Sequence, residues 1–416
     1  MKFGLSNIRT LLRHCGNPQK KFPSVHIAGT NGKGSTSSMI AAVLQAAGYK
    51  TGLYTSPHIT LFNERIRING KMISDDELIY YIRKLRPTID SLKATFFEAT
   101  TAVAFEYFAD EKVDIAVVET GLGGRLDATN VLSPEVSVIT SIGRDHTRQL
   151  GRTLKAIAYE KGGIIKPQTP CVTSVQKKEV MRELRSIAIR KRSRLIVAPS
   201  LKTKTNTAQN LDFQMVTIQT GFGRYENLRI PLLGSHQIKN AALAITALEC
   251  LQAGGMIIPR EAFRMGLRGV RRLTGLRGRF EILRKEPLII LDVGHNPSGI
   301  SATVETLRNY RRGKTVIVFG VMGDKEYRPM IRSLALLKPE VFAVRPDMER
   351  ALPAETISAL FRARKCKAQS CSSVASAVEK ALRNQNKNDL LMICGSHYIA
   401  GEALESLRRH LRSKKS

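Results

Sequence analysis

A lysine inside a glycine-rich stretch is the first candidate for chemistry in this chain. The stretch Gly29–Thr36 follows a short β-branched run, Ser24–Ala28, and precedes residues with the apolar spacing of a helix. In a strand–loop–helix unit, glycines let backbone N–H groups turn toward an anion, and the helix N-terminus adds partial positive charge. Lys33 could then reach terminal phosphates while a hydroxyl faces a magnesium ion. The candidates for nucleotide binding are Asn31, Gly32, Lys33, Gly34, Ser35 and Thr36.

The spacing of this loop differs from the common pattern G-x-x-x-x-G-K-[ST]. Gly34 separates Lys33 from Ser35, so the hydroxyl comes one residue late. A Gly-Lys pair between a strand and a helix can also be an ordinary turn. The loop alone therefore leaves both interpretations open.

Two apolar strands further along end in groups that could hold a metal ion. Val113–Val118 is typical of a buried parallel strand, and Glu119 follows at its carboxyl end, where ligands collect in open α/β sheets. Asp145 and His146 come just after a second such strand, Val136–Ile142. A carboxylate suits Mg²⁺, whereas imidazole suits it less well. Ser56 could add a neutral oxygen from a neighbouring strand end, although a serine before a proline is also a common turn residue.

The segments that must position these residues alternate between strand and helix. A capping box, Ser74–Glu77, opens a predicted helix over Leu78–Arg86. Residues 194–232 suggest a small antiparallel addition that contains the polar loop Lys202–Asn210. Further helices are predicted over Phe97–Phe108, Thr153–Lys161 and His236–Leu251.

After Arg279 the strand–helix pattern starts again. Strands are predicted at Leu288–Leu291, Val316–Phe319, Val341–Val344 and Leu390–Cys394. We therefore predict an α/β protein with a P-loop-type, mostly parallel sheet domain over residues 1–280, which includes the antiparallel addition. A smaller Rossmann-like α/β domain follows over residues 287–416, with a cleft between the two. The linker is expected near Arg271–Glu286, a stretch dense in arginine and glycine.

The composition is that of a globular protein rather than a disordered one. The 416 residues are 43% hydrophobic and 24% charged. No apolar run approaches the roughly 20 residues that cross a bilayer. The residues Met1–Gly16 carry several basic side chains, so we expect no signal peptide. Six cysteines lack metal-type or disulfide-type spacing, which favours reduced thiols and a cytoplasmic location.

The formal net charge of +31 could indicate a nucleic-acid partner. However, lysine and arginine are spread over the whole length. Aromatic residues for base stacking make up only 6%, with no tryptophan. We interpret the charge as a solvated surface that also suits anionic substrates. We expect no specific nucleic-acid partner and no membrane partner.

Taken in order, these motifs resemble the folylpolyglutamate synthase/dihydrofolate synthase family, a branch of the Mur ligase superfamily. The resemblance extends from about Gly16 to the C-terminus and includes, besides the Gly-Lys loop, the stretches Glu119–Asn130, Asp145–Thr147, Glu160–Ile164 and Asp292–Pro297. It implies two α/β domains and ATP-dependent amide formation between a carboxylate and L-glutamate through an acyl phosphate. The implied cofactors are ATP and Mg²⁺ at two sites. The implied partners are small molecules, namely dihydropteroate or folates, L-glutamate and ATP, and a monomer would suffice.

The resemblance also implies roles for individual residues. Ser56 and Glu119 would hold one Mg²⁺, and His146 and Lys161 would help to hold a second. Lys161 matches the carbamylated lysine of the family, in which CO₂ converts a cation into an anion with two oxygen donors. The implied catalytic residues are Lys33, His146 and Lys161.

Further matches concern the nucleotide and the amino-acid substrate. Asn240 matches an asparagine on the adenine side, and Asp292 an aspartate that opens the second domain. Arg279 matches an arginine near the linker, but the local sequence Arg277–Gly278–Arg279 lets either arginine take that role. The residues implied around the incoming glutamate are Arg65, His295 and Ser396. The form Arg125–Leu126–Asp127 is associated with members that also make dihydrofolate from dihydropteroate.

Two alternatives stay open. A Mur-type ligase of peptidoglycan precursors shares the loop, the magnesium sites and the modified lysine. The early position of the loop, which leaves no room for an N-terminal UDP-sugar domain, and the extra Gly34 both favour the folyl branch. The net charge motivates the second alternative, a nucleotide-binding protein associated with RNA.

Overall fold

The protein forms two compact units in a computed structural model that describes residues 4–199, 210–310, 313–383 and 385–413. Of these, unit 1 comprises residues 4–199, 215–231 and 236–276. Unit 2 comprises residues 210–214, 232–235 and 277–413. No helix in the described ranges has the length and apolar character needed to cross a membrane.

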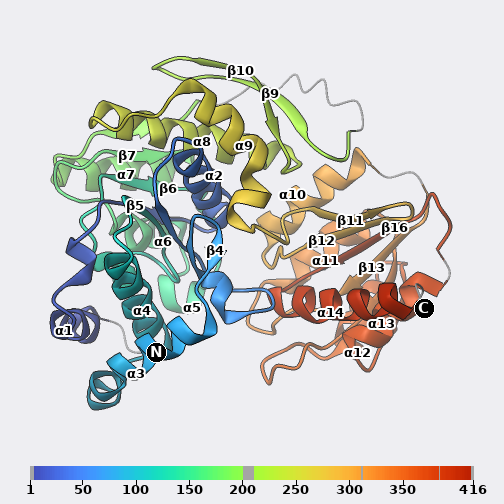
Figure 1. Ribbon diagram of the computed structural model, residues 1–416. Helices are drawn as coiled ribbons and strands as arrows, with labels where there is room; N and C mark the ends of the chain where they lie inside the picture. Colours follow the sequence, from blue (N-terminus) through green and yellow to red (C-terminus); the bar gives the residue numbers. More distant parts are fainter. Residues whose placement is uncertain (1–3, 200–209, 311–312, 384, 414–416) are drawn as a thin grey trace. The chain divides into compact units, whose positions relative to one another are not determined.

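Unit 1 is built on an eight-stranded sheet with the order β4-β3-β2-β5-β1-β6-β7-β8 (Figure 1). Its strands are β1 (Ser24–Ala28), β2 (Thr51–Tyr54), β3 (Ile66–Ile68), β4 (Lys71–Met72), β5 (Ile115–Glu119), β6 (Val136–Ile139), β7 (Cys171–Thr173) and β8 (Leu195–Val197). The central strands β1 and β5 are buried along their whole length, as parallel strands covered on both faces require. All pairings are parallel except β2–β3 and β3–β4, so the carboxyl ends of β1, β2, β5 and β6 share one edge.

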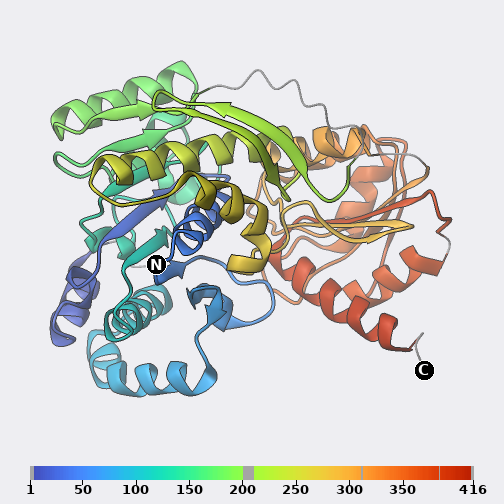
Figure 2. The same cartoon turned by 45° about the horizontal axis from the view of Figure 1, so that its top comes forward.

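Helices cover the sheet of unit 1, and two of them begin at capping boxes formed by Ser74 and Thr95. The helices are α1 (Ser6–His14), α2 (Lys33–Ala46), α3 (Asp75–Leu92), α4 (Phe96–Asp110), α5 (Thr147–Leu150), α6 (Leu154–Gly162), α7 (Lys178–Arg190), α8 (Ser235–Ala253) and α9 (Arg260–Thr274). Short 3₁₀ helices occupy η1 (Pro18–Lys20), η2 (Phe62–Arg65) and η3 (Ala128–Val131). Figure 2 shows the two-stranded sheet of β9 (Gln214–Gln219) and β10 (Arg224–Ile230) beside α9, with which β10 is in contact.

Unit 2 contains a six-stranded sheet with the order β11-β12-β16-β13-β14-β15. Its strands are β11 (Glu281–Lys285), β12 (Leu288–Asp292), β13 (Thr315–Phe319), β14 (Glu340–Ala343), β15 (Lys367–Ser370) and β16 (Leu390–Cys394), and its helices are α10 (Pro297–Arg308), α11 (Tyr327–Ala335), α12 (Ala354–Arg362), α13 (Val374–Arg383) and α14 (His397–Ser413). All pairings are parallel except that of β11 with β12. An apolar cluster that includes Ile290, Ile317 and Met392 forms part of its core.

The predicted α/β class, with a parallel-dominated sheet followed by a second sheet, is confirmed. The antiparallel addition predicted over residues 194–232 appears as β9–β10, but Leu195–Val197 in that range is instead β8, a parallel strand of the main sheet. The helix predicted to end at Arg86 continues, as α3, through Pro87 to Leu92. A helix-interior proline loses a hydrogen bond, but Ile89 and Leu92 pack on the core and offset that loss. Of the predicted polar loop, residues 202–209 lie outside the described ranges.

The linker expected near Arg271–Glu286 is shorter than the sequence analysis suggested. Arg271–Thr274 completes α9 and Glu281–Lys285 forms β11, so only residues 275–280 connect the two elements. The division between the units falls between Leu276 and Arg277.

His26 in β1 makes the stability of unit 1 depend on pH. Its ring is fully buried, and burial, together with the nearby Lys166, lowers its pKa from 6.5 to about 3. Nε2 lies 2.8 Å from Thr129 Oγ1, which itself donates to Asp127, while Nδ1 is buried without a partner among the described residues. A proton on Nδ1 would therefore have no acceptor.

We expect acid to destabilise the protein through this group. Between pH 6.5 and 3 the unfolded chain binds a proton that folded His26 excludes, so stability falls as the pH drops below about 6.5. Lowering the pH from 7.5 to 5.5 should cost about 1 kcal/mol through His26. Urea unfolding of the wild type and of His26→Gln at both pH values measures this loss. An equal loss in both proteins would contradict the assignment.

Candidate active site

The glycine-rich loop connects β1 to α2 and passes against α8. Gly32 precedes α2 with a φ of 89°, and a Cβ there would lie 2.4 Å from Asn240 Oδ1. A larger residue would therefore strain the backbone and displace Asn240. The sequence analysis placed both residues at a nucleotide, and the fold does bring them together.

Lys33 follows directly after Gly32 and is the first residue of α2. Its side chain is 17% exposed, and Nζ lies 3.6 Å from Glu119 Oε1. Ser35 and Thr36 are buried in the same helical turn, and Thr36 Oγ1 has no partner among the described residues. A buried hydroxyl without a partner, beside a helix N-terminus and a lysine, fits a phosphate or a hydrated metal ion.

Glu119 and Ser56 meet because β5 and β2 are parallel neighbours in the sheet. Glu119 ends β5 and is 3% exposed, and its Oε2 accepts a hydrogen bond from the Ser56 backbone N–H at 3.5 Å. The carboxylate, the serine and Lys33 thus form one polar cluster at the edge where the central strands end. This set contains the hard oxygen donors that Mg²⁺ prefers.

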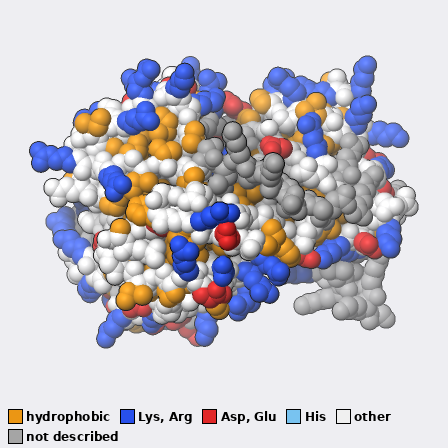
Figure 3. Space-filling model, turned by 90° about the horizontal axis from the view of Figure 1, so that it is seen from above, with side chains coloured by type: hydrophobic (Ala, Val, Ile, Leu, Met, Phe, Trp, Pro, Cys, Tyr) orange, Lys and Arg blue, Asp and Glu red, His pale blue; other side chains and the backbone are white. Residues whose placement is uncertain are grey.

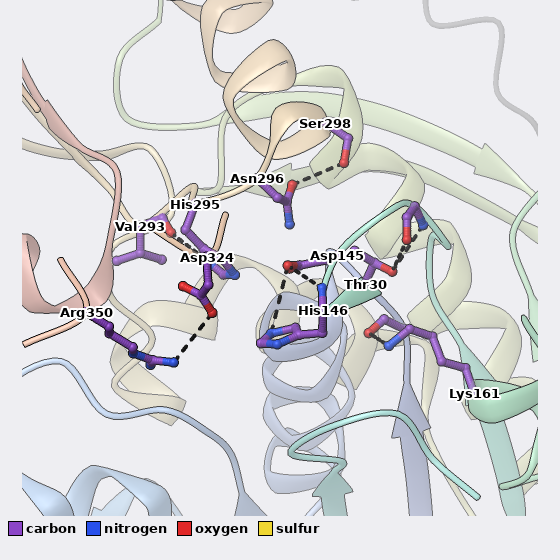
Figure 4. Close-up of polar contacts among 12 residues, drawn as sticks. Thr30, Asp145, His146, Lys161, Val293, His295, Asn296, Ser298, Asp324 and Arg350 are labelled. Atoms are coloured by element: carbon purple, nitrogen blue, oxygen red, sulfur yellow. Dashed lines mark hydrogen bonds and ion pairs between the residues drawn. The ribbon is translucent and has the colours of Figure 1, made fainter. Parts of the chain in front are cut away.

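Lys161 lies at the end of α6 and is 5% exposed. Its Nζ donates to the backbone oxygen of Gly29, at the start of the glycine-rich loop, over 2.8 Å (Figure 4). Burial, and next the charge of Lys33, lower the pKa of Lys161 to about 7, against the opposing effect of nearby carboxylates. A large fraction of this amine is therefore neutral near pH 7, which is the form that reacts with CO₂.

His146 and Asp145 come from the segment that follows β6. His146 has a φ of 48° and precedes α5, and its backbone N–H donates to Asp145 Oδ1 over 2.9 Å (Figure 4). Thr30 Oγ1 donates to Gly143 O and holds this segment against the glycine-rich loop. The described ranges contain no group of three or more His, Cys, Asp and Glu side chains arranged to hold a metal ion. A metal at this edge would therefore need other donors, such as Ser56 or a modified Lys161.

Arg65 ends η2 and is 9% exposed. Its Nε donates to His58 Nδ1 over 2.9 Å, and its guanidinium lies 5.7 Å and 5.5 Å from the ring centres of Phe62 and Phe96. The sequence analysis did not assign a role to His58 or Phe96. Phe96 is 31 residues from Arg65, so no local pattern could have paired them.

In unit 2, both oxygens of Asp292 accept hydrogen bonds from protein groups. Oδ2 accepts from Phe280 N at 2.9 Å, and Oδ1 accepts from Gly294 N at 2.8 Å and Thr303 Oγ1 at 3.1 Å. The carboxylate thus fixes the turn that follows β12 and leads to His295.

His295 and Ser396 lie at the ends of the neighbouring strands β12 and β16. The rings of His295 and His397 are 5.5 Å apart, and Ser396 Oγ accepts from Ile399 N at the start of α14. Figure 4 shows His295 beside Val293, and His295 Nδ1 lies 3.0 Å from the backbone oxygen of Val293. Two of the residues predicted around glutamate therefore follow adjacent strands at the same edge of the sheet of unit 2.

The whole chain is similar to known ligases. Residues 27–248 match the Mur ligase middle domain, and residues 278–397 match the Mur ligase glutamate ligase domain. The dihydrofolate synthase/folylpolyglutamate synthase of Bacillus subtilis (strain 168) is 37% identical over 98% of this chain and 96% of its own length. Crystal structures of Mycobacterium tuberculosis folylpolyglutamate synthase complexed with ADP and AMPPCP align with a TM-score of 0.89 and 32% identity, over 97% of this chain and 95% of that one.

A structure of a bifunctional folylpolyglutamate synthase/dihydrofolate synthase with Mn, AMPPNP and L-glutamate bound also aligns. Its TM-score is 0.85 at 28% identity, with 98% and 95% of the two chains covered.

The fold, the glycine-rich loop and the two matched domains define a ligase of the Mur type. Within that class, the chain belongs to the folylpolyglutamate synthase/dihydrofolate synthase family.

Proposed function

We propose that this protein is an ATP-dependent carbon–nitrogen ligase that adds L-glutamate to dihydropteroate, to folyl (poly)glutamates, or to both. The cluster of Lys33, Glu119 and Ser56 at the end of the glycine-rich loop is the observation that carries the proposal. The relative from Bacillus subtilis, whose name contains both activities, supports it.

The reaction must overcome the poor reactivity of a carboxylate, which has no good leaving group. A carboxylate oxygen of the pteroate or folate attacks the γ-phosphorus of ATP, and the bond to ADP breaks. The resulting acyl phosphate is an electrophile, and the amine of glutamate attacks its carbonyl carbon. Inorganic phosphate leaves with the original carboxylate oxygen, and the ammonium protons pass to solvent. The protein must neutralise phosphate charge and align the two substrates.

In this proposal, residues Asn31–Thr36 bind the phosphates through the Lys33 ammonium and the backbone N–H groups of Gly32–Ser35. The N–H groups of Asn31 and Thr36 already donate to Ser141 O and Gly32 O. Ser56 and Glu119 hold one Mg²⁺, and His146 and Lys161 hold a second. When bound, the metal ions neutralise charge on the phosphate oxygens. The divalent metal and AMPPNP in a related structure support the use of a metal and ATP.

We further propose that Lys161 carries a carbamate. CO₂ adds to the neutral amine, one proton is released, and the product is an anion with two oxygen donors. The buried position beside the Gly29 carbonyl and the pKa near 7 support this assignment. An unmodified ammonium in the same place would repel a metal ion.

The assignments of Asn240, Arg279 and Asp292 to the nucleotide, and of Arg65, His295 and Ser396 to the substrates, are also proposals. Arg277 pairs with Glu281 through Nε at 2.9 Å and Nη2 at 2.8 Å. We propose Arg279 for the contact with phosphate because it is the residue that matches the family's arginine near the linker. The division into domains at 1–280 and 287–416, the monomer and the cytoplasmic location remain predictions.

Replacing Glu119 with glutamine should reveal the metal site. The amide keeps the shape but removes the charge, so we expect about 100-fold slower turnover and a higher magnesium concentration for half-maximal activity. A matched control is Glu106→Gln, which changes another buried glutamate paired with a lysine, Lys84, away from the loop. A magnesium dependence like that of the wild type would make Glu119 a structural residue.

Comparing acceptors tests the proposed function against the two alternatives. Release of ADP should require L-glutamate together with dihydropteroate or a reduced folate, and added RNA should not change it. On the face that Figure 3 shows, Lys and Arg side chains are scattered. Activity only with a UDP-linked peptidoglycan precursor would favour the Mur-type alternative. ATP turnover that depends on RNA would favour the RNA-associated one.

A further inference from the structure

The end of α6 that carries Lys161 is held by a distant loop, residues 121–130. The backbone N–H of Arg125 donates to Glu160 O over 2.7 Å. At Gly124 the two segments lie so close that a Cβ would be 2.8 Å from Lys161 O. The last carbonyl groups of a helix lack partners within the helix, and here the loop satisfies one of them.

The side chain of Arg125 strengthens this contact. Its Nε and Nη2 donate to Glu160 Oε1 over 3.1 Å and 2.8 Å, and its guanidinium lies 5.4 Å from the centre of the Tyr159 ring. Two donors on one carboxylate and a stacked ring fix the guanidinium in one orientation.

Asn130 in η3 binds the main chain on the C-terminal side of Lys161. Its Nδ2 donates to Arg125 O over 2.9 Å and to Gly163 O over 3.1 Å, so both amide hydrogens are used. The side chain is 8% exposed. The main chain is therefore tied to the loop at Glu160 and at Gly163, the two sides of Lys161.

Stability alone is a weak reason for these contacts. The side chains of Arg125 and Glu160 are 41% and 19% exposed, and pairs of this kind contribute about 1 kcal/mol or less. Their geometric effect is larger, because Lys161 must place one atom beside Gly29 from the end of a long side chain. Misplacement of a reacting group by about 1 Å can cost 100-fold in rate.

We propose that Arg125, Asn130 and Glu160 are positioning residues that set where Lys161 presents its amine or carbamate. The proposal rests on the proposed function of Lys161. It explains why two residues of the 121–130 loop bind the segment around Lys161 by main chain and side chain together.

The test compares Arg125→Ala, the conservative Arg125→Lys and Asn130→Ala with the wild type. Glu111→Gln is the control, because Lys50 and Glu111 form another ion pair, 2.9 Å apart, in which the lysine is about as exposed as Arg125 and the glutamate is more exposed than Glu160. The measurements are kcat, KM for ATP, thermal unfolding, and the ¹³C carbamate signal of protein equilibrated with labelled bicarbonate.

Arg125→Ala and Asn130→Ala should lower kcat about tenfold or more, with KM for ATP within about twofold of the wild type. They should also need more bicarbonate for the same carbamate signal, and Arg125→Lys should recover part of both properties. Wild-type kcat and bicarbonate dependence in both alanine variants would overturn the proposal. A loss of kcat that is fully explained by the fraction of unfolded protein in each variant would also overturn the proposal. Absence of the signal in the wild type would instead refute the carbamate, while the kcat and KM values still test the positioning of Lys161.

Discussion

Lys33→Ala should abolish turnover while the protein stays folded. The substitution removes the cation at the start of α2, which lies 3.6 Å from the Glu119 carboxylate and would face the phosphates of ATP. Loss of one such charge at a phosphoryl-transfer site costs about 100-fold or more in kcat. Lys33 also lowers the pKa of Lys161, so its removal should raise that pKa and reduce the fraction of neutral amine.

The fold should survive because Glu119 keeps the hydrogen bond from the Ser56 backbone. Circular dichroism and thermal unfolding check the fold, and release of ADP measures the turnover. Lys50→Ala, a lysine whose side chain is 39% exposed, is the control and should stay active. Turnover like that of the wild type in Lys33→Ala would contradict the role of the glycine-rich loop in binding the phosphates of ATP.

Lys161→Ala should be impaired about as severely, and the loss should be partly reversible. Truncation removes the group that we propose to carry the carbamate and leaves space beside Gly29 O. A short carboxylic acid at high concentration could place its oxygens there and restore part of the activity. Lys155→Ala on the exposed side of the same helix is the matched control.

The turnover of the wild type should depend on carbon dioxide, whereas the turnover of Lys161→Ala should not. Prolonged depletion of bicarbonate and CO₂ should lower wild-type turnover, and added bicarbonate should restore it. A wild type that is insensitive to depletion, together with a variant that no carboxylic acid rescues, would contradict the carbamate. The second metal would then need another ligand.

The parts of the site that were predictable are those with local signals. Glu119 ends an apolar strand and the Gly-Lys loop separates a strand from a helix, so each could be assigned from neighbouring residues. The parallel order of β2, β5 and β1 then explains why Ser56, Glu119 and the loop meet.

The parts that were not predictable depend on long-range contacts. The burial of Lys161 arises from packing against a loop more than 30 residues away, and its sequence neighbours suggest a surface position. The pairs Arg65–His58 and Arg125–Glu160 likewise depend on how loops fold. The antiparallel strands β3 and β4 are only three and two residues long, and β11 is a partly exposed edge strand, so all three lack the continuous apolar runs of the central strands.

Product analysis with an ¹⁸O-labelled acceptor tests whether the protein ligates glutamate through an acyl phosphate. The protein is incubated with ATP, L-glutamate and either dihydropteroate or a reduced folate, each labelled with ¹⁸O in the reacting carboxylate, and all products are analysed by mass. The account predicts a product heavier by one glutamyl residue, formed together with ADP, and phosphate that contains one ¹⁸O atom from the carboxylate. Absence of a glutamylated product with either acceptor, or phosphate without the label, would contradict ligation through an acyl phosphate.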